Sequence, residues 1–151
     1  MDGALKIAQR SNLADNHGRL RHQVGTTTFD GNPADFTLPT HQRWHLYAIR
    51  FSYACSAVLG TRRLRIEIRS GATVIQRTEA QLTQIANQTR SYTATPATRD
   101  SAAFINNEAQ IRLPPNLYLS PGQTVRIAVT AGRLDDSIEN PEYTLEDWID
   151  G

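Results

Sequence analysis

The chain has 151 residues and a mass of 16.9 kDa, with 16 basic and 15 acidic side chains and a formal net charge of +1. This length is that of one domain, able to bury a core without disulfides or metal ions. No apolar run approaches the roughly 20 residues that span a bilayer, so no membrane partner is expected. The single cysteine, Cys55, excludes an intramolecular disulfide and any zinc site built from several cysteines.

The net charge conceals an uneven distribution along the chain. Seven acidic residues and no Lys or Arg fall within residues 135–151, which leaves 16 basic and 8 acidic residues in 1–134. The net charge is therefore +8 on the first part and −7 on the last. Such asymmetry predicts a charged partner, or a tail that docks on its own or a neighbouring body.

The predicted elements begin after residues 1–24, which show no sustained periodicity and are expected to form an extended arm. A short β-prone run over 26–29 is closed by a strong turn signal, Asp30-Gly31-Asn32-Pro33. Residues 44–53 then alternate in polarity, which predicts a long and mostly buried strand.

The clearest alternation lies in residues 62–69, where aliphatic and charged side chains take turns. This pattern predicts a strand with one wet face, and Ser70-Gly71 leads into a return strand over 73–79. Further strands are predicted over 88–95, 110–113, 117–119 and 124–130.

Roughly seven or eight short strands at turn spacings of about 8–12 residues, without a convincing helix, predict an all-β fold. The expected architecture is an antiparallel, jelly-roll-like β-sandwich, because the connections are too long for a simple meander. The predicted organisation is an N-terminal arm (1–24), a β-sandwich domain (25–134) and an acidic C-terminal tail (135–151).

The motifs that mark catalytic sites are missing from the sequence. It contains no nucleophile elbow, no zinc-protease histidine pair and no glycine-rich phosphate loop. Cys55 lies among small residues, a setting typical of a packed side chain rather than a nucleophile. We therefore expect no enzymatic activity, no cofactor and no metal.

Arginines gather on the predicted strand 62–69, at Arg62, Arg63, Arg65 and Arg69. Three interpretations are open: phosphate binding in a nucleic acid, a solvated face that discourages strand aggregation, and salt bridges to acidic segments of neighbouring copies. The aromatic residues of single-strand binders are absent from this strand, which disfavours nucleic acid.

The acidic tail carries apolar side chains among its carboxylates: Tyr143, Leu145, Trp148 and Ile149. A purely solvating tail rarely contains such residues. They are predicted to be anchors that bury in a groove, of the same subunit or another, with carboxylates placed to meet arginine. The alternative is a disordered acidic tail.

An ordered set of segments across residues 36–134 resembles small β-sandwich virion proteins of tailed bacteriophages, of the capsid decoration (cement) type. The segments are Leu38-Pro39, Arg43-Trp44, Gly60-Thr61-Arg62-Arg63, Ser101-Ala102-Ala103-Phe104 and Ser120-Pro121-Gly122. The resemblance implies a structural role in the virion, as a decoration protein or a head, tail or fibre component. Expected partners are the major capsid protein or other virion proteins and further copies of the chain, in a dimer or trimer. The resemblance supplies no catalytic residues.

A second hypothesis is a receptor- or carbohydrate-binding module of a tail or head fibre. In that case, we expect stacking platforms at Trp44, Tyr47, Tyr53 and Tyr92. A third hypothesis, a cupin-like enzyme, requires clustered metal-binding histidines.

Overall fold

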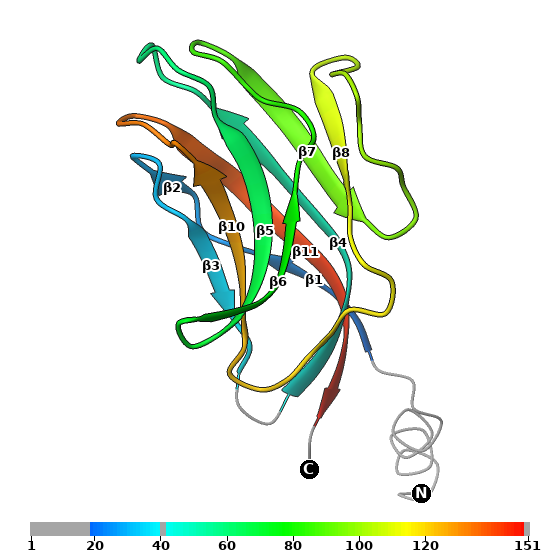
Figure 1. Ribbon diagram of the computed structural model, residues 1–151. Coiled ribbons are helices and arrows are strands. Elements are labelled where there is room, and N and C mark those ends of the chain that lie inside the picture. Colours follow the sequence, from blue (N-terminus) through cyan, green and yellow to red (C-terminus); the bar gives the residue numbers. More distant parts are fainter. Residues whose placement is uncertain (1–18, 40–41, 150–151) are drawn as a thin grey trace, which may run out of the picture.

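The computed structural model describes residues 19–39 and 42–149, which form two β-sheets packed face to face (Figure 1). Residues 1–18 of the predicted arm lie outside the described residues. None of the described residues forms a helix, and so none of them provides a helix able to cross a membrane. The prediction of an all-β sandwich is confirmed.

The larger sheet contains seven strands of the described chain. Its order is β1 (Arg19–Val24), β11 (Ser137–Ile149), β4 (Gln42–Ala54), β7 (Thr89–Thr95) and β8 (Glu108–Arg112), with β2 (Thr28–Phe29) beside β11 and β9 (Tyr118–Leu119) beside β4. Its pairs are antiparallel except β7 with β8, which run parallel.

The smaller sheet contains four strands of the described chain and is antiparallel throughout. Its order is β3 (Ala34–Thr37), β10 (Thr124–Thr130), β5 (Arg63–Ser70) and β6 (Thr73–Glu79). The strands predicted over 62–69, 73–79 and 124–130 correspond to β5, β6 and β10, because side chains of period two identify a half-buried strand.

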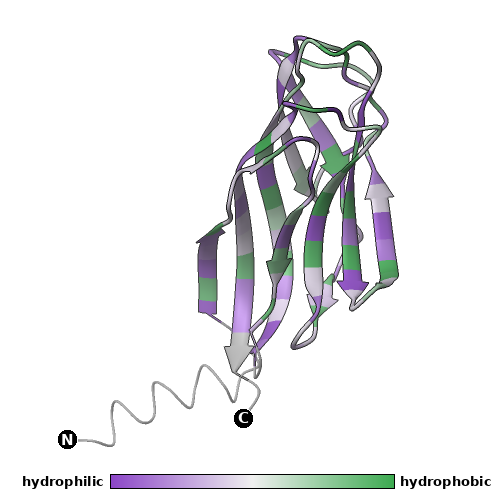
Figure 2. Cartoon of the chain, turned by 90° about the vertical axis from the view of Figure 1, so that its left-hand side faces the viewer, coloured by the Kyte–Doolittle hydropathy of each residue, from purple (hydrophilic) through white to green (hydrophobic). Residues whose placement is uncertain are grey.

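The core lies between the sheets and is built from alternate residues of each strand. Leu64, Ile66 and Ile68 of β5 point inward, as do Val125 and Ile127 of β10, and all are buried. The strands therefore carry alternating bands of hydrophobic and hydrophilic residues (Figure 2). Burial of these side chains supplies the main driving force for folding.

A β-bulge at Tyr47 divides β4 into two phases. The pairing with β11 shifts by one residue between Leu46 and Ala48, which leaves Tyr47 as the extra residue. Trp44 and Leu46 are consequently buried before the bulge and Ile49 after it. Tyr47 lies on the outer side of the larger sheet, and because of the bulge Ile49 rather than Ala48 is the next buried residue of β4.

The prediction of an acidic tail over 135–151 is wrong for most of these residues, because β11 lies within the larger sheet between β1 and β4. A bulge around Asn140, whose φ is +48°, absorbs Pro141 inside this strand. Part of the predicted arm is also in the sheet, since 19–24 pair with β11 as strand β1. Residues 150–151 lie outside the described residues.

Candidate functional site

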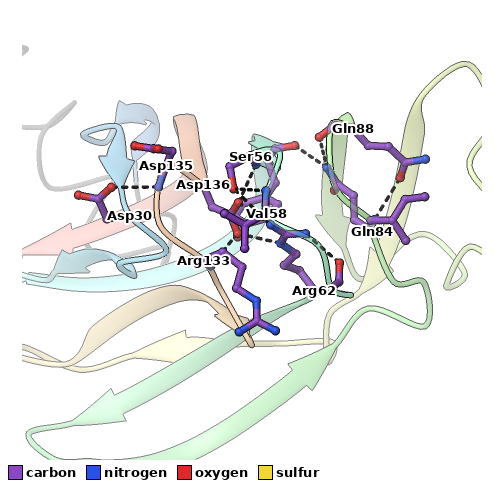
Figure 3. Close-up of polar contacts among 12 residues, drawn as sticks. Asp30, Ser56, Val58, Arg62, Gln84, Gln88, Arg133, Asp135 and Asp136 are labelled. Atoms are coloured by element: carbon purple, nitrogen blue, oxygen red, sulfur yellow. Dashed lines mark hydrogen bonds and ion pairs between the residues drawn. The ribbon is translucent and has the colours of Figure 1, made fainter.

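A buried carboxylate, Asp136, organises the loops at one end of the sandwich (Figure 3). It accepts two hydrogen bonds from Arg62, Nε at 2.9 Å and Nη2 at 3.0 Å. It also accepts the Tyr53 hydroxyl at 2.7 Å and the backbone N–H groups of Ser56 at 2.7 Å and Arg133 at 2.8 Å. Arg62 also donates from Nη1 to the carbonyl of Gly60 at 2.8 Å. Arg62 and Asp136 are both fully buried, so other groups of the chain compensate their charges in place of water.

Burial by itself would raise the pKa of Asp136, but the hydrogen bonds from Arg62, Ser56, Tyr53 and Arg133 outweigh it. They hold the pKa of Asp136 well below its usual range. Burial and the hydrogen bond to Asp136 raise the pKa of Tyr53 far above its ordinary value. Near neutral pH the carboxylate of Asp136 is therefore ionised, and the hydroxyl of Tyr53 keeps the proton that it donates to Asp136.

Gln84 connects a further loop to the same centre. Its side-chain Nε2 donates to the carbonyls of Tyr53 at 2.8 Å and Gln88 at 2.7 Å, and its Oε1 accepts the Tyr92 hydroxyl at 2.9 Å. Its backbone exchanges two hydrogen bonds of 2.8 Å with that of Arg62. The side chains of Arg62, Asp136 and Gln84 therefore fix the loops 55–62, 80–88 and 131–136 relative to one another.

The loop 30–33 is held against the same set by a close glycine contact. Gly31 has a φ of +72°, and a Cβ there would lie 3.0 Å from the backbone carbon of Gly132. Asp135 N also donates to Asp30 Oδ1 at 3.1 Å. Glycine is favoured at position 31, because a side chain there would be strained by the backbone angle and crowded by Gly132.

These four loops, 30–33, 55–62, 80–88 and 131–136, gather at the upper end of the sandwich in Figure 1 and are called the loop end. Large apolar side chains are exposed on or beside them: Phe29, Val58, Leu59, Ile85 and Leu134. Leu59 is 83% exposed and Leu134 is 66% exposed. A rigid set of loops that exposes apolar side chains is typical of an interaction surface.

The predicted arginine cluster divides between the interior and the surface. Arg62 is buried, so its prediction as a surface contact is wrong. Arg65 and Arg69 lie on the outer face of β5, where both donate to the buried carboxylate of Glu67. Arg63 is exposed at the start of the same strand. Its contact with a partner stays a prediction, as do those of Arg65 and Arg69.

Glu67 meets a further arginine across the strand pair. Arg77 of β6 donates to Glu67 from Nε at 3.0 Å and from Nη2 at 2.8 Å. Burial would raise the pKa of Glu67, yet hydrogen bonds from Arg77 and Arg69 and the charge of Arg65 lower it. On the same face Arg126 forms a bidentate pair with Asp35, in which two nitrogens donate to the two carboxylate oxygens. Much of the basic charge is thus neutralised within the chain.

The predicted tail anchors belong to the chain's own sheet. Tyr143 and Leu145 are buried in the core, as one of the two open alternatives expected, so the other alternative, contact with a partner, is wrong for them. Trp148 and Ile149 pair with Arg43 and Gln42 through the backbone of β11, and their side chains lie outside the described part. They looked like anchors because a central strand and an inserted segment share the same alternation of apolar and acidic residues.

The acidic residues of β11 meet basic groups of the same chain. Asp147 accepts Arg21 Nη1 at 2.9 Å and lies 3.8 Å from Arg19 Nε, both on β1. Asp136, the residue before β11, pairs with Arg62. Part of the charge asymmetry along the sequence therefore comes from acidic residues that pair with basic residues of the same chain. A charged partner, the other explanation, stays a prediction.

Of the four predicted stacking aromatics, only Tyr47 lies on the surface. Trp44, Tyr53 and Tyr92 are buried, so they provide no platform for a ligand. The sequence interpretation missed Tyr118, which is 61% exposed on β9. Its signal is the short strand around Leu119, in which one of two neighbouring residues must face outward.

Tyr118, His45 and Tyr47 form a row of rings on the outer face of the larger sheet, called the aromatic row. The His45 ring centroid lies 4.4 Å from that of Tyr47 and 4.4 Å from that of Tyr118. Tyr47 donates its hydroxyl to Glu146 of β11 at 2.6 Å. This hydrogen bond, together with burial, raises the pKa of Tyr47 to about 12, so its hydroxyl keeps its proton at neutral pH.

Further along the same face lies a shallow depression of about 260 Å³. Its outward-facing lining is polar: Arg50, Ser52, Ser91, Thr93, Glu108, Asn140 and Glu142. Arg50 lies on the outward side of β4, after Tyr47 and Ala48, so the depression and the aromatic row follow the same face of this strand and are together called the strip. Within the described residues, no group of three or more His, Cys, Asp or Glu side chains is placed to hold a metal ion.

Comparison with known proteins identifies no family. No protein-family model matches the chain, and no curated protein matches it.

Several solved structures have a loosely similar fold. A family 11 carbohydrate-binding module from Clostridium thermocellum, in complex with a β-1,3-1,4-mixed-linked tetrasaccharide, is 11% identical with a TM-score of 0.40, over 83% of this chain and 82% of that one. The dimeric latent PorU of Porphyromonas gingivalis is 11% identical with a TM-score of 0.43, over 87% of this chain and 13% of that one. The Dit protein of phage SPP1, from a hub adsorption apparatus, is 12% identical with a TM-score of 0.36, over 88% of this chain and 48% of that one.

Proposed function

We propose that this chain is a non-enzymatic structural protein of a bacteriophage virion, a capsid decoration (cement) protein that binds the capsid surface and neighbouring copies. The ordered resemblance over residues 36–134 supports the virion assignment. The observation that carries the docking role is the loop end, where exposed apolar side chains sit on loops fixed by a buried ion pair.

The physical reason is preorganisation. Loops already held by Asp136, Arg62 and Gln84 lose little conformational entropy when a partner covers them, so more of the contact energy appears as affinity. Exposed side chains such as Leu59 and Leu134 would then be buried at the centre of the contact. The major capsid protein is the partner that the virion assignment favours.

Sedimentation with capsids of the phage that encodes the chain tests this role. Purified protein should sediment with capsids that lack it, and the double variant Leu59→Ser with Leu134→Ser should bind at least tenfold more weakly. Ile75→Ser is the matched control, because Ile75 is 54% exposed on β6, away from the loop end. Absence of the chain from purified particles, or equal binding by the double variant, would contradict the proposal.

The proposal includes association into a dimer or trimer, as cement proteins act by stapling neighbouring subunits. Light scattering on the purified protein measures this directly. If the protein is strictly monomeric and still binds capsids, the docking role stands and the proposed dimer or trimer is refuted.

A further inference from the structure

The proposed docking function uses the loop end and does not involve the outer face of the larger sheet. This face carries the aromatic row of Tyr118, His45 and Tyr47 at one end of a strip. The polar depression occupies the rest. The strip runs along β4 from His45 to Ser52, about 23 Å at the rise of an extended strand. An elongated ligand is therefore the shape that matches it.

The chemistry of the strip combines two kinds of group. The row offers aromatic surface, and Tyr118, at its end, is 61% exposed. Ring faces attract the C–H side of a pyranose through dispersion and the ring quadrupole. A protein partner would also accept aromatic residues, but the row continues into groups with both donors and acceptors rather than into further apolar side chains.

The depression supplies those polar groups close together. Ser52 and Ser91 hydroxyls lie 3.2 Å apart across β4 and β7. Arg50 offers a fork of donors, while Glu108 and Glu142 offer paired acceptors. Neighbouring hydroxyls of a sugar act as donors and acceptors at once. The donors and acceptors of the depression can satisfy both roles.

The charge of the strip selects among sugars. Glu108, Glu142 and Glu146 lie on this face with one arginine of the depression, Arg50. Carboxylates at these positions disfavour uronic acids and sialic acids, since like charges repel at short range. From these observations, we propose that the strip binds a neutral oligosaccharide or polysaccharide, with Tyr118 and Tyr47 as its stacking and hydroxyl contacts.

This activity goes beyond capsid docking and uses a separate surface. A virion protein with both surfaces would hold the particle through its loop end and present the strip to a glycan. The two activities are therefore separable by mutation, which keeps each proposal falsifiable on its own.

The experiment is an array of neutral hexose and N-acetylhexosamine oligosaccharides, with uronic- and sialic-acid oligosaccharides of matched length. Titration calorimetry then follows with the strongest neutral binder. We expect binding to neutral members only, with an affinity about tenfold lower in Tyr118→Ala, equivalent to about 1.4 kcal/mol. Tyr47→Phe should weaken it while keeping the ring. Ile75→Ala on the opposite sheet is the control and should bind as the wild type does.

Tyr118→Ala should keep the wild-type urea midpoint and capsid binding, because its ring is exposed and far along the sheet from the loop end. The proposal is overturned if no neutral oligosaccharide binds, if anionic ones bind better, or if Tyr118→Ala binds as tightly as Ile75→Ala. Loss of capsid binding in the loop-end double variant alone would leave this inference untouched.

Discussion

Replacing Asp136 by Asn tests whether the buried ion pair holds the loop end. Asp136 accepts hydrogen bonds from Arg62, Tyr53, Ser56 and Arg133, and neither it nor Arg62 is exposed. The variant keeps the size of the side chain but leaves the guanidinium buried without a counter-charge. Breaking a buried pair from one side costs about 3–5 kcal/mol, a large part of the roughly 5–15 kcal/mol that stabilises a domain.

Urea unfolding followed by tryptophan fluorescence measures this cost, since Trp44 is buried in the core. With an m-value of about 2 kcal/mol/M, the midpoint should fall by about 2 M. Asp135→Asn is the control, because Asp135 is exposed beside Asp136 and its change should cost less than about 0.5 kcal/mol. Removing both charges, in Arg62→Met with Asp136→Asn, should recover part of the loss.

The pH dependence gives an independent check on the same group. The folded pKa of Asp136 lies below its ordinary value of 3.8, so the unfolded state binds more protons in acid. Its contribution is complete above about pH 4 and is lost as the pH falls further. Asp136→Asn should therefore flatten the fall in stability below pH 4. A loss of less than about 1 kcal/mol at neutral pH, or an unchanged acid slope, refutes the ion-pair account.

Three further predictions concern other parts of the fold. Ala131→Gly should stabilise the protein by about 0.5–1 kcal/mol in urea unfolding, since Ala131 has a φ of +59° that glycine adopts without strain; a destabilised variant would contradict this. Burial raises the pKa of Cys55 to about 11, so its alkylation by iodoacetamide at pH 8 should be slow when folded and fast in urea, and equal rates would contradict the burial. Glu67→Gln should cost about 2 kcal/mol, because it leaves Arg65, Arg69 and Arg77 close together without their shared carboxylate; an unchanged unfolding midpoint would argue against that cluster.

The strands that could be predicted from the sequence are those with an uninterrupted pattern. In β5 and β10 apolar and polar residues alternate, and tight turns mark where the strands end. Strand β6 was predicted as the return strand of the Ser70-Gly71 turn, and the register shift in its pairing with β5 was not. The interior of β4 was also predicted, but its bulge at Tyr47 was not. A bulge changes which face a residue occupies without changing the composition of the strand, so sequence periodicity alone does not locate it.

Strand β11 was missed because two local signals opposed it. Asn140-Pro141 interrupts its alternation, and proline normally argues against a central strand. Its carboxylates also suggested a solvated tail. Asp147 of β11 and Asp136 just before it pair with Arg21 and Arg62, which are more than 70 residues away in sequence, and these pairs exist only once the sheet has formed.

The loop end and the aromatic row could be predicted least, because their residues also come together only in the folded chain. Arginines in 62–69 look alike in the sequence, yet Arg62 is buried and Arg63 is exposed, because the side chain of Arg62 turns inward to Asp136 and its neighbour points to the opposite side. The aromatic row joins His45 and Tyr47 of β4 to Tyr118 of β9, and nothing in the local sequence links these segments.

The position of β11 has a consequence for how the chain acquires its structure during synthesis. It is the last strand of the described chain to leave the ribosome, and it lies between β1 and β4, which are made long before it. Until then, the N-terminal strand lacks a neighbour and β4 exposes an unpaired edge to other chains. The larger sheet therefore closes only after translation of β11, through contacts distant in sequence that form slowly. Premature termination before residue 137 would yield an aggregation-prone fragment rather than a shortened protein.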